Sequence, residues 1–390
     1  MRKKLLSAAA CGSAILLALT ACGSSGETDS SDAALKGSGT GADCKISAEV
    51  PIAAAFSLTG AAAQYGAGQK NALELAVADL NKVGGVTYKL TVEDDQTDPK
   101  QAIQVFEGFV NAGASVIIGP TLSNTAMQTD PVAQDGKTPV MGVSNTATGI
   151  TEIGDYVFRD SLTEDAVIPQ TVKAAVESLD LKKVVVMYSN DDAFTESGYK
   201  AFAAALDDEG VEVADTVTFS KADTDFRALL DTVKSADADA IVVSALIDAA
   251  VPLVTQAREI GIDTPIVGGN GFNAPALIKG AGEAAEGVIV GAAWNSGSDN
   301  EQNVKFIEDY TAAYDAAPDQ FSAQAYAGMQ IIDHAVRVGC SGGRDDIKVN
   351  LGEMTDVPTV LGDVSLNENR DAVHDALVQV VKDGKFAILN

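Results

Sequence analysis

After the first fifty residues, the chain alternates short apolar segments with longer segments of helical periodicity. The short segments are rich in Val, Ile and Ala, which is typical of buried strands. The segment Gly68–Val83 shows the helical pattern, because Ala72, Leu75 and Ala76 form an apolar stripe while Glu74 lies on the opposite, polar face. Strands that alternate with helices predict an α/β protein whose parallel sheets are covered by helices.

The same pattern places the individual elements. The predicted strands are Pro51–Phe56, Lys89–Asp94, Ser115–Ile118, Pro139–Gly142, Val184–Tyr188, Ile241–Ala245, Pro265–Val267 and Val288–Ala292. The predicted helices between them include Gly68–Val83, Pro99–Ala112, Glu164–Ser178, Glu196–Glu209, Phe226–Ser235 and Ala249–Ile260. Roughly 345 residues take part in this alternation, which exceeds one ordinary core, so we predict two domains, each with a doubly wound parallel sheet.

The N-terminal residues have the pattern of an export signal. A basic start precedes the apolar segment Leu5–Leu19, which is too short to cross a bilayer. The sequence Leu19–Cys22 resembles the bacterial lipobox, so we predict a lipoprotein signal peptide at residues 1–21 and lipidation of Cys22. An ordinary secretory signal is the alternative. Residues 22–43 are rich in Gly and Ser, and we expect them to form a flexible tether.

The chain is strongly acidic, with a formal net charge of -28 at pH 7. An acidic surface repels the phosphates of nucleic acid, and no cluster of Lys and Arg stands out to overcome that repulsion. We therefore expect no nucleic acid partner. We interpret the acidic residues as a solvated surface that keeps the protein soluble.

The four cysteines divide into two groups. Cys11 lies in the apolar part of the signal, and Cys22 is the predicted lipid acceptor. Cys44 and Cys340 remain as one possible pair. In an oxidising compartment, a disulfide between them would join the start of the fold to a distant segment and stabilise it by about 2–5 kcal/mol. Neither has metal-ligand spacing, and we predict no metal site.

Ligands of doubly wound sheets bind beyond the carboxyl ends of the strands. The predicted loops at these positions are rich in small polar residues. They are Ser57–Gly60, Gly119–Thr125, Ser144–Thr146, Ser189–Asp192 and Gly268–Gly271. Serine, threonine and asparagine in such loops predict a site that binds a small polar molecule.

Catalytic motifs are weak or absent. Gly66 and Gly68 match part of a dinucleotide-binding fingerprint, but Asn71 stands where the third glycine is needed. The sequence has only two histidines and contains no Gly-x-Ser-x-Gly, Walker or His-Glu-x-x-His motif. We therefore predict a binding protein with no catalytic residues and no cofactor.

Several motifs, in order along the folded part of the chain, resemble those of branched-chain amino acid binding proteins. The matching segments are Phe56–Gly66, Asn71–Ala76, Asn81–Gly85, Asp94–Pro99, Ile118–Pro120, Ser144–Thr146 and Gln256–Gly261. These proteins are the type I periplasmic binding proteins of ABC importers. The resemblance implies two lobes joined by a three-segment hinge, with the ligand held in the cleft between them.

The resemblance also implies which residues hold the ligand's carboxylate. In the family, a serine after the third strand and backbone and threonine groups after the fourth strand bind it. Ser123, Ser144, Asn145 and Thr146 fall on these positions. Hydroxyls and free N–H groups at a helix N-terminus form an anion site without Lys or Arg. The alternative is that these side chains only cap helices.

Further positions are assigned to the rest of the ligand by the same resemblance. Tyr65 matches an aromatic residue that covers the ligand, and Phe194 matches an aromatic residue of the second lobe. Leu246 falls where the family often has another aromatic residue.

Asn270 stands where amino acid binders usually have an acidic partner for the ammonium group. Asp192 or Asp248 could supply the missing charge; otherwise the ligand is uncharged at that end.

The expected domain limits follow from the resemblance. Lobe 1 comprises residues 45–163 and 293–363, and lobe 2 comprises 164–292 and 364–390. The predicted hinge segments are Arg159–Thr163, Ala292–Ser296 and Leu361–Ser365. Closure around the ligand is expected to involve rotation at these three segments.

We predict a monomeric, extracytoplasmic solute-binding lipoprotein, anchored to the outer face of the cell membrane by Cys22, that delivers an amino acid-like ligand to an ABC permease. A branched-chain or aliphatic amino acid is the first choice of ligand. The alternatives are an amide, urea or aromatic carboxylate as the ligand, or a role as the sensing module of a receptor.

Overall fold

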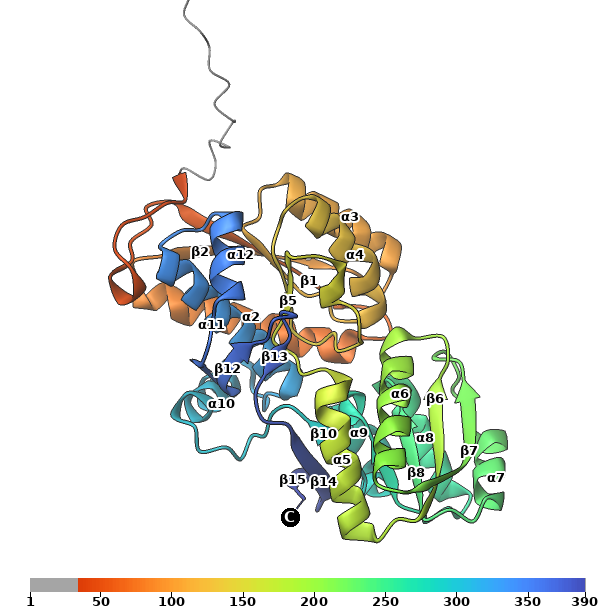
Figure 1. Cartoon of the computed structure of the whole chain (residues 1–390). Helices are drawn as coiled ribbons and strands as arrows, with labels where there is room; N and C mark the ends of the chain where they lie inside the picture. The colour runs from red at the N-terminus through yellow and green to blue at the C-terminus, as the bar shows by residue number, and fades with distance from the viewer. Residues whose placement is uncertain (1–33, 390) are drawn as a thin grey trace, which may run out of the picture.

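The computed structural model describes residues 34–389, which form two lobes, each built on one large β-sheet (Figure 1). The predicted signal peptide at residues 1–21, the predicted lipidation site Cys22 and the predicted tether residues up to 33 lie outside the described residues. No helix among residues 34–389 is long and apolar enough to cross a membrane.

The first lobe contains a sheet of five parallel strands in the order β2-β1-β3-β4-β5. The strands are β1 (Glu49–Phe56), β2 (Thr87–Asp94), β3 (Val116–Ile118), β4 (Val140–Gly142) and β5 (Val157–Arg159). Its helices are α2 (Ala63–Val83), α3 (Pro99–Asn111), α4 (Ser123–Asp135), α11 (Gln320–Gly339) and α12 (Arg344–Gly352).

Strand β1 shows why this sheet is buried on both faces. Ile52 and Ala54 point to one face and pack in a cluster with residues of α2 and α11. Ala53 and Ala55 point to the other face and pack with residues of α3 and α4. Because successive side chains alternate between two covered faces, the strand is apolar throughout, as parallel strands usually are.

The second lobe contains a sheet of seven strands in the order β15-β14-β10-β9-β8-β6-β7. The parallel strands are β6 (Lys183–Ser189), β7 (Glu212–Phe219), β8 (Ala240–Ser244), β9 (Ile266–Gly268) and β10 (Ile289–Ala292). The antiparallel strands β14 (Leu377–Lys382) and β15 (Lys385–Ile388) extend it at one edge. The helices are α5 (Glu164–Leu179), α6 (Ala193–Asp208), α7 (Arg227–Ser235), α8 (Ile247–Glu259) and α9 (Pro275–Ala281).

The parallel strands of both lobes follow the same order, and this order predicts where a ligand crevice forms. Numbered within each lobe, they run second, first, third, fourth, fifth. The direction of winding therefore reverses between the first and third strands, and loops there border a crevice in doubly wound folds. In this chain those loops follow β1 and β3 in the first lobe, and β6 and β8 in the second.

The chain passes between the two large sheets three times. The first two connections follow β5 and β10 and contain the predicted hinge segments Arg159–Thr163 and Ala292–Ser296. The helix α10 (Glu301–Tyr314) comes after the second connection. The third connection leads into β14 between Val373 and Leu377.

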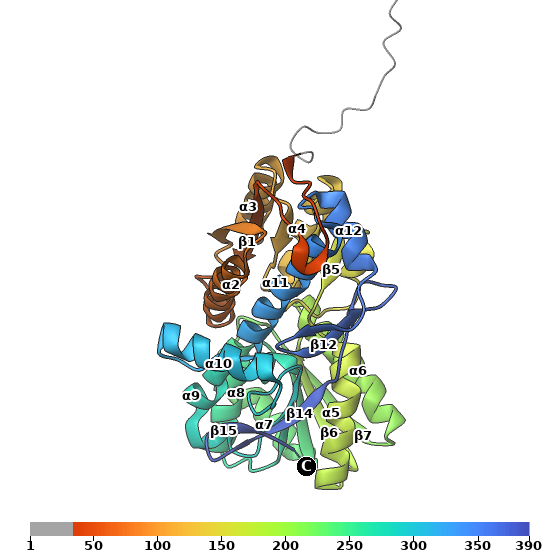
Figure 2. The same cartoon turned by 90° about the vertical axis from the view of Figure 1, so that its left-hand side faces the viewer.

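The predicted third hinge segment, Leu361–Ser365, and the predicted lobe limit after residue 363 differ from this arrangement. They fall on β12 (Gly362–Leu366), which pairs with β11 (Val357–Thr359) and β13 (Ala372–Val373) in a small antiparallel sheet. Figure 2 shows β12 between α11 and α5. Val364 and Ala372 belong to the buried cluster of the first lobe, so that lobe continues to about Val373.

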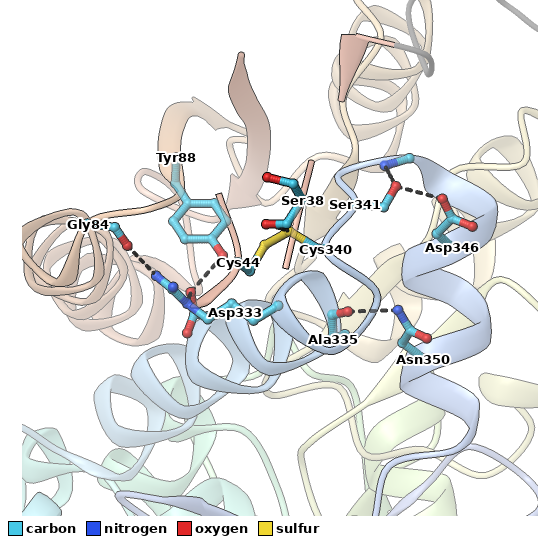
Figure 3. Close-up of a disulfide and its surroundings, with 12 residues drawn as sticks. Ser38, Cys44, Gly84, Tyr88, Asp333, Ala335, Cys340, Ser341, Asp346 and Asn350 are labelled. Atoms are coloured by element: carbon cyan, nitrogen blue, oxygen red, sulfur yellow. Dashed lines mark hydrogen bonds and ion pairs between the residues drawn. A yellow bond between two sulfur atoms is a disulfide. The ribbon is translucent and has the colours of Figure 1, made fainter. Parts of the chain in front are cut away.

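The N-terminal arm also differs from its prediction. Residues up to 43 were expected to form a tether, but Leu35 is buried and the Gly37 N–H donates to the Cys340 carbonyl at 2.9 Å. Cys44 and Cys340 form a disulfide, with their Cα atoms 5.3 Å apart (Figure 3). The arm is therefore fastened to the loop that follows α11, and it belongs to the first lobe.

Candidate functional site

Loops that follow the strands of both lobes border a small space, which we call the cleft cavity. Its volume is about 20 Å³, close to that of a single water site. It is lined by Tyr65, Thr121, Leu122, Ser123, Ser144, Asp192, Phe194, Leu246, Asn270, Gly271 and Phe321. The lobes are therefore closed on one another at this point.

Most of the residues proposed from the sequence line this cavity. They are Tyr65, Ser123, Ser144, Phe194, Leu246 and Asn270. Asn145 and Thr146 are fully buried and do not line it. The Asn145 side chain donates to the Pro120 carbonyl at 3.0 Å, and the Thr146 hydroxyl donates to Glu164 at 2.7 Å. Their side chains thus support the loop after β4 from behind.

Two hydroxyls of the first lobe face the cavity in different bonding states. Ser123, the first residue of α4, accepts hydrogen bonds from the backbone N–H groups of Thr146 and Ala147 at 3.1 and 3.2 Å. Its own proton is then free to point at an acceptor. Ser144 donates to the Thr121 carbonyl at 2.7 Å and accepts from Gln69. Ser123 is therefore the better placed of the two to bind a carboxylate.

Tyr65 joins the two lobes across the cavity. Its hydroxyl donates to the Gly271 carbonyl at 3.1 Å and accepts from the Ile247 N–H at 2.8 Å, both in the second lobe. Its ring lies 4.6 Å from that of Phe321 at the start of α11. Burial raises the pKa of Tyr65 far above its ordinary value, so the hydroxyl is neutral and acts as donor and acceptor at once.

The carboxylate that lines the cavity belongs to Asp192. It accepts from the Asn124 side-chain amide at 2.6 Å and from the Thr195 N–H at 3.2 Å. Desolvation by burial raises its pKa above the ordinary value. Asn270 lies on the same lobe, but its Oδ1 already accepts from Gln320 Nε2 at 2.5 Å. Of the two acidic residues named as possible substitutes for Asn270, Asp192 lines the cleft cavity and Asp248 does not.

The other alternative, Asp248, lies outside the cleft cavity. It lines a second space of about 250 Å³, which shares Tyr65, Leu122 and Leu246 with the cavity. The Gln64 side chain donates to it at 3.4 Å. Asp248 therefore lies beside the cleft cavity but does not line it.

Glu164 was not among the residues proposed from the sequence. It is fully buried behind the loop after β4, where one oxygen accepts from Thr146 and Oε2 has no partner among the described residues. Desolvation by burial raises its pKa to about 8. An acidic residue after the N-cap Thr163 is an ordinary helix-start feature, so nothing in the local sequence distinguishes this one.

Within residues 34–389, no group of three or more His, Cys, Asp or Glu residues is arranged to hold a metal ion.

Comparison with known proteins places the chain among binding proteins. The family model described as periplasmic binding protein matches residues 49–385. A Leu/Ile/Val-binding protein of Rhizobium johnstonii, BraC3, is 25% identical over 329 residues, which cover 83% of this chain and 89% of that protein.

Solved structures have the same fold. The branched-chain amino acid binding protein LivJ of Streptococcus pneumoniae, in complex with isoleucine, superimposes with a TM-score of 0.82 and 28% identity, covering 87% of this chain and 98% of that one. A solute-binding protein of R. palustris in complex with benzoate gives a TM-score of 0.80 at 23% identity, over 88% and 96% of the two chains.

Proposed function

The chain belongs to the periplasmic binding protein family, and from this premise we propose that it is the solute-binding component of an ABC importer that captures a branched-chain or other aliphatic amino acid. The family is extracytoplasmic, and the relatives that resemble this chain are solute-binding proteins rather than enzymes. In this role the protein holds its ligand between the lobes and presents it to a permease.

The observation that supports an amino acid is the convergence of both lobes on the cleft cavity. Ser123 offers a hydroxyl proton, backed by two backbone amides, to a carboxylate. Asp192 offers a buried charge to an ammonium group across the same space. Phe194 and Leu246 provide the apolar contact for an aliphatic side chain.

Ligand entry requires the lobes to separate. The cavity of about 20 Å³ is far smaller than the 300 Å³ or more that is typical of ligand pockets. We propose that rotation at the three connections, which follow β5, β10 and β13, opens the cleft. A ligand that contacts both lobes then favours closure by its differential affinity for the closed state.

A ligand without an ammonium group is the second candidate. Asn270 replaces the acidic residue expected there, and its Oδ1 is engaged by Gln320. The pKa of Asp192 is raised by burial, and a protonated Asp192 would donate a hydrogen bond rather than attract a cation. These features favour an amide, a urea or an aromatic carboxylate.

Calorimetric titration distinguishes the two candidates. We expect L-leucine to bind, and Ser123→Ala to weaken its binding about tenfold or more, since the variant loses a hydrogen bond to a charged group. Ser38→Ala, at the far end of the first lobe, serves as the control. Binding of benzoate or isobutyramide with no heat from leucine, isoleucine or valine would establish the second candidate.

We also propose that the chain is a lipoprotein, attached to the membrane through Cys22 after removal of residues 1–21. Palmitate labelling of the expressed protein, lost in Cys22→Ala, is the expected result. Release of an unlabelled protein with residue 23 or a later residue at its N-terminus would contradict it.

A further inference from the structure

A larger space lies on the other side of Gln320 from the cleft cavity, and we call it the hinge crevice. Its volume is about 450 Å³, within the range of small-molecule sites. Ile278, Gln379 and Phe386 of the second lobe line it together with Trp294 of the second connection and Pro318 and Gln320 of the first lobe. An occupant would therefore contact both lobes and the hinge at once.

Gln379 gives this crevice a defined chemistry. The residue is only 3% exposed, and its Nε2 donates to the Trp294 carbonyl at 3.0 Å. Its Oε1 is buried and has no partner among the described residues. A buried amide oxygen without a donor costs free energy, which a bound N–H or O–H group recovers.

The remaining walls favour a neutral molecule with an apolar body. Trp294, Ile278 and Phe386 provide aromatic and aliphatic surface. Lys279 and Lys385 also line the crevice but are exposed, so their charges stay at the rim. Asp319 also lines the crevice, but its carboxylate already accepts from the Ser322 N–H and hydroxyl at 2.8 and 2.6 Å, and burial raises its pKa. The two lysines repel a cation at the rim, and Asp319 is engaged by Ser322, so a compact neutral amide fits best.

Gln320 lines the hinge crevice and bonds to a residue of the cleft cavity. Its Nε2 donates to Asn270, which lines the cleft cavity. Its Oε1 accepts from the Asn273 side chain at 2.8 Å and from the Ala293 N–H at 2.6 Å. This one side chain of the first lobe therefore bonds to two residues of the second lobe and to the connection after β10. Movement of the lobes must break or shift these bonds, and an occupant beside them biases that movement.

We propose that the hinge crevice is a second binding site, for small neutral amides with an apolar body, whose occupant favours the closed arrangement of the lobes. The site itself stands independently of the ligand in the cleft. Its coupling to that ligand rests on the proposed function, and by linkage the two ligands then raise each other's affinity by the same factor.

Trp294 is the single tryptophan of the chain, so intrinsic fluorescence reports directly on the crevice. With benzamide as the probe, we expect a saturable change in tryptophan emission. Gln379→Met should weaken binding about tenfold, and Ile278→Phe should block it by filling the space. Gln302→Met, in a surface groove of the first lobe, is the matched control and should leave it unchanged. Thermal melts check that each variant is folded.

A double variant, Ser123→Ala with Asp192→Asn, separates the crevice from the cleft. We expect benzamide to bind this variant as it binds the wild type. The proposal is overturned if benzamide causes no saturable change in the wild type, or if the double variant loses benzamide binding. It is also overturned if Gln379→Met and Ile278→Phe bind benzamide as tightly as the wild type does.

Coupling is tested by titrating L-leucine with and without saturating benzamide. We expect leucine to bind severalfold more tightly in its presence, and Gln320→Leu to abolish the difference. Equal leucine affinity in both conditions would overturn the coupling. If leucine does not bind at all, the proposed function fails. The effect of the crevice on lobe closure is then tested by small-angle scattering, in which benzamide should lower the radius of gyration of the protein.

Discussion

The two lobes face the cleft cavity with different chemistry. The first lobe presents neutral hydroxyls that its own loops already hold in hydrogen bonds, as at Ser123 and Ser144. The second lobe presents the buried carboxylate of Asp192 next to the apolar side chains of Phe194 and Leu246. The first lobe is thus a preorganised surface for a polar head group, and the second decides which charge and shape the rest of the ligand has.

Removing the charge of the second lobe should have the largest effect on binding. We expect Asp192→Asn to lower leucine affinity by about 100-fold or more, because the ligand's ammonium is left buried without a partner. Asp191→Asn is the matched control, since Asp191 bonds to Ser220 on the surface. Calorimetry measures both. Unchanged or tighter binding by Asp192→Asn would show that the ligand has no ammonium group there.

Breaking the disulfide should affect the stability of the first lobe and spare the site. Cys340 follows the end of α11, a helix of 20 residues whose start carries Phe321, so about 30 Å separates the disulfide from the cavity. We expect Cys44→Ser with Cys340→Ser to lower the free energy of unfolding by about 2–5 kcal/mol. Denaturant unfolding measures it. A change in leucine affinity at unchanged stability would contradict this assignment.

Removing the Tyr65 hydroxyl tests whether its bonds to the second lobe keep the two lobes closed around the ligand. Tyr65→Phe loses the bonds to Ile247 and Gly271, so we expect about a tenfold loss of affinity and a larger radius of gyration in the ligand-free protein. Tyr88→Phe is the control, because its hydroxyl bonds to Asp333 within the first lobe. Equal scattering profiles for Tyr65→Phe and the wild type would show that this contact does not hold the lobes closed.

The last expected effect concerns the pH dependence of stability and Glu164, at the boundary between the lobes. Its pKa is about 8 in the folded protein against an ordinary 4.5, so between these pH values the folded state binds more protons than the unfolded state. Stability from this group therefore falls as pH rises through that window, by at most about 1.4 kcal/mol per pH unit.

We expect Glu164→Gln to reduce this slope in unfolding experiments from pH 5 to 8. Glu177→Gln, on the exposed face of α5, should leave the slope as in the wild type. Equal slopes for the wild type and Glu164→Gln would mean that Glu164 titrates normally.

Local patterns predicted the buried strands well and the exposed ones poorly. The predicted strand Val184–Tyr188 lies within β6, whose residues are mostly buried. Strand β7 was not predicted, because it lies at the sheet edge and most of its residues are exposed, including Glu212 and Asp215. An edge strand with one partner lacks the continuous apolar run that marks a central strand.

The helix starts at the site show a similar limit. The helix predicted at Gly68–Val83 begins at Ala63, so Tyr65 lies in the first turn of α2 rather than in a loop. Phe194 likewise lies in the first turn of α6. The Ala-rich segment before Gly68 has no N-cap side chain to mark the start, and contacts with the second lobe hold Tyr65 in place.

By itself, the sequence determined the α/β class, the polar loops after the strands and the pair of cysteines left for a disulfide, because periodicity and residue type depend on neighbours along the chain. The tertiary structure decided which acid reaches the cavity, how Gln320 joins the cleft to the hinge, and that the arm at Leu35 and the strand β12 belong to the first lobe. These depend on contacts between residues far apart in the chain, which only the packing of the two lobes creates.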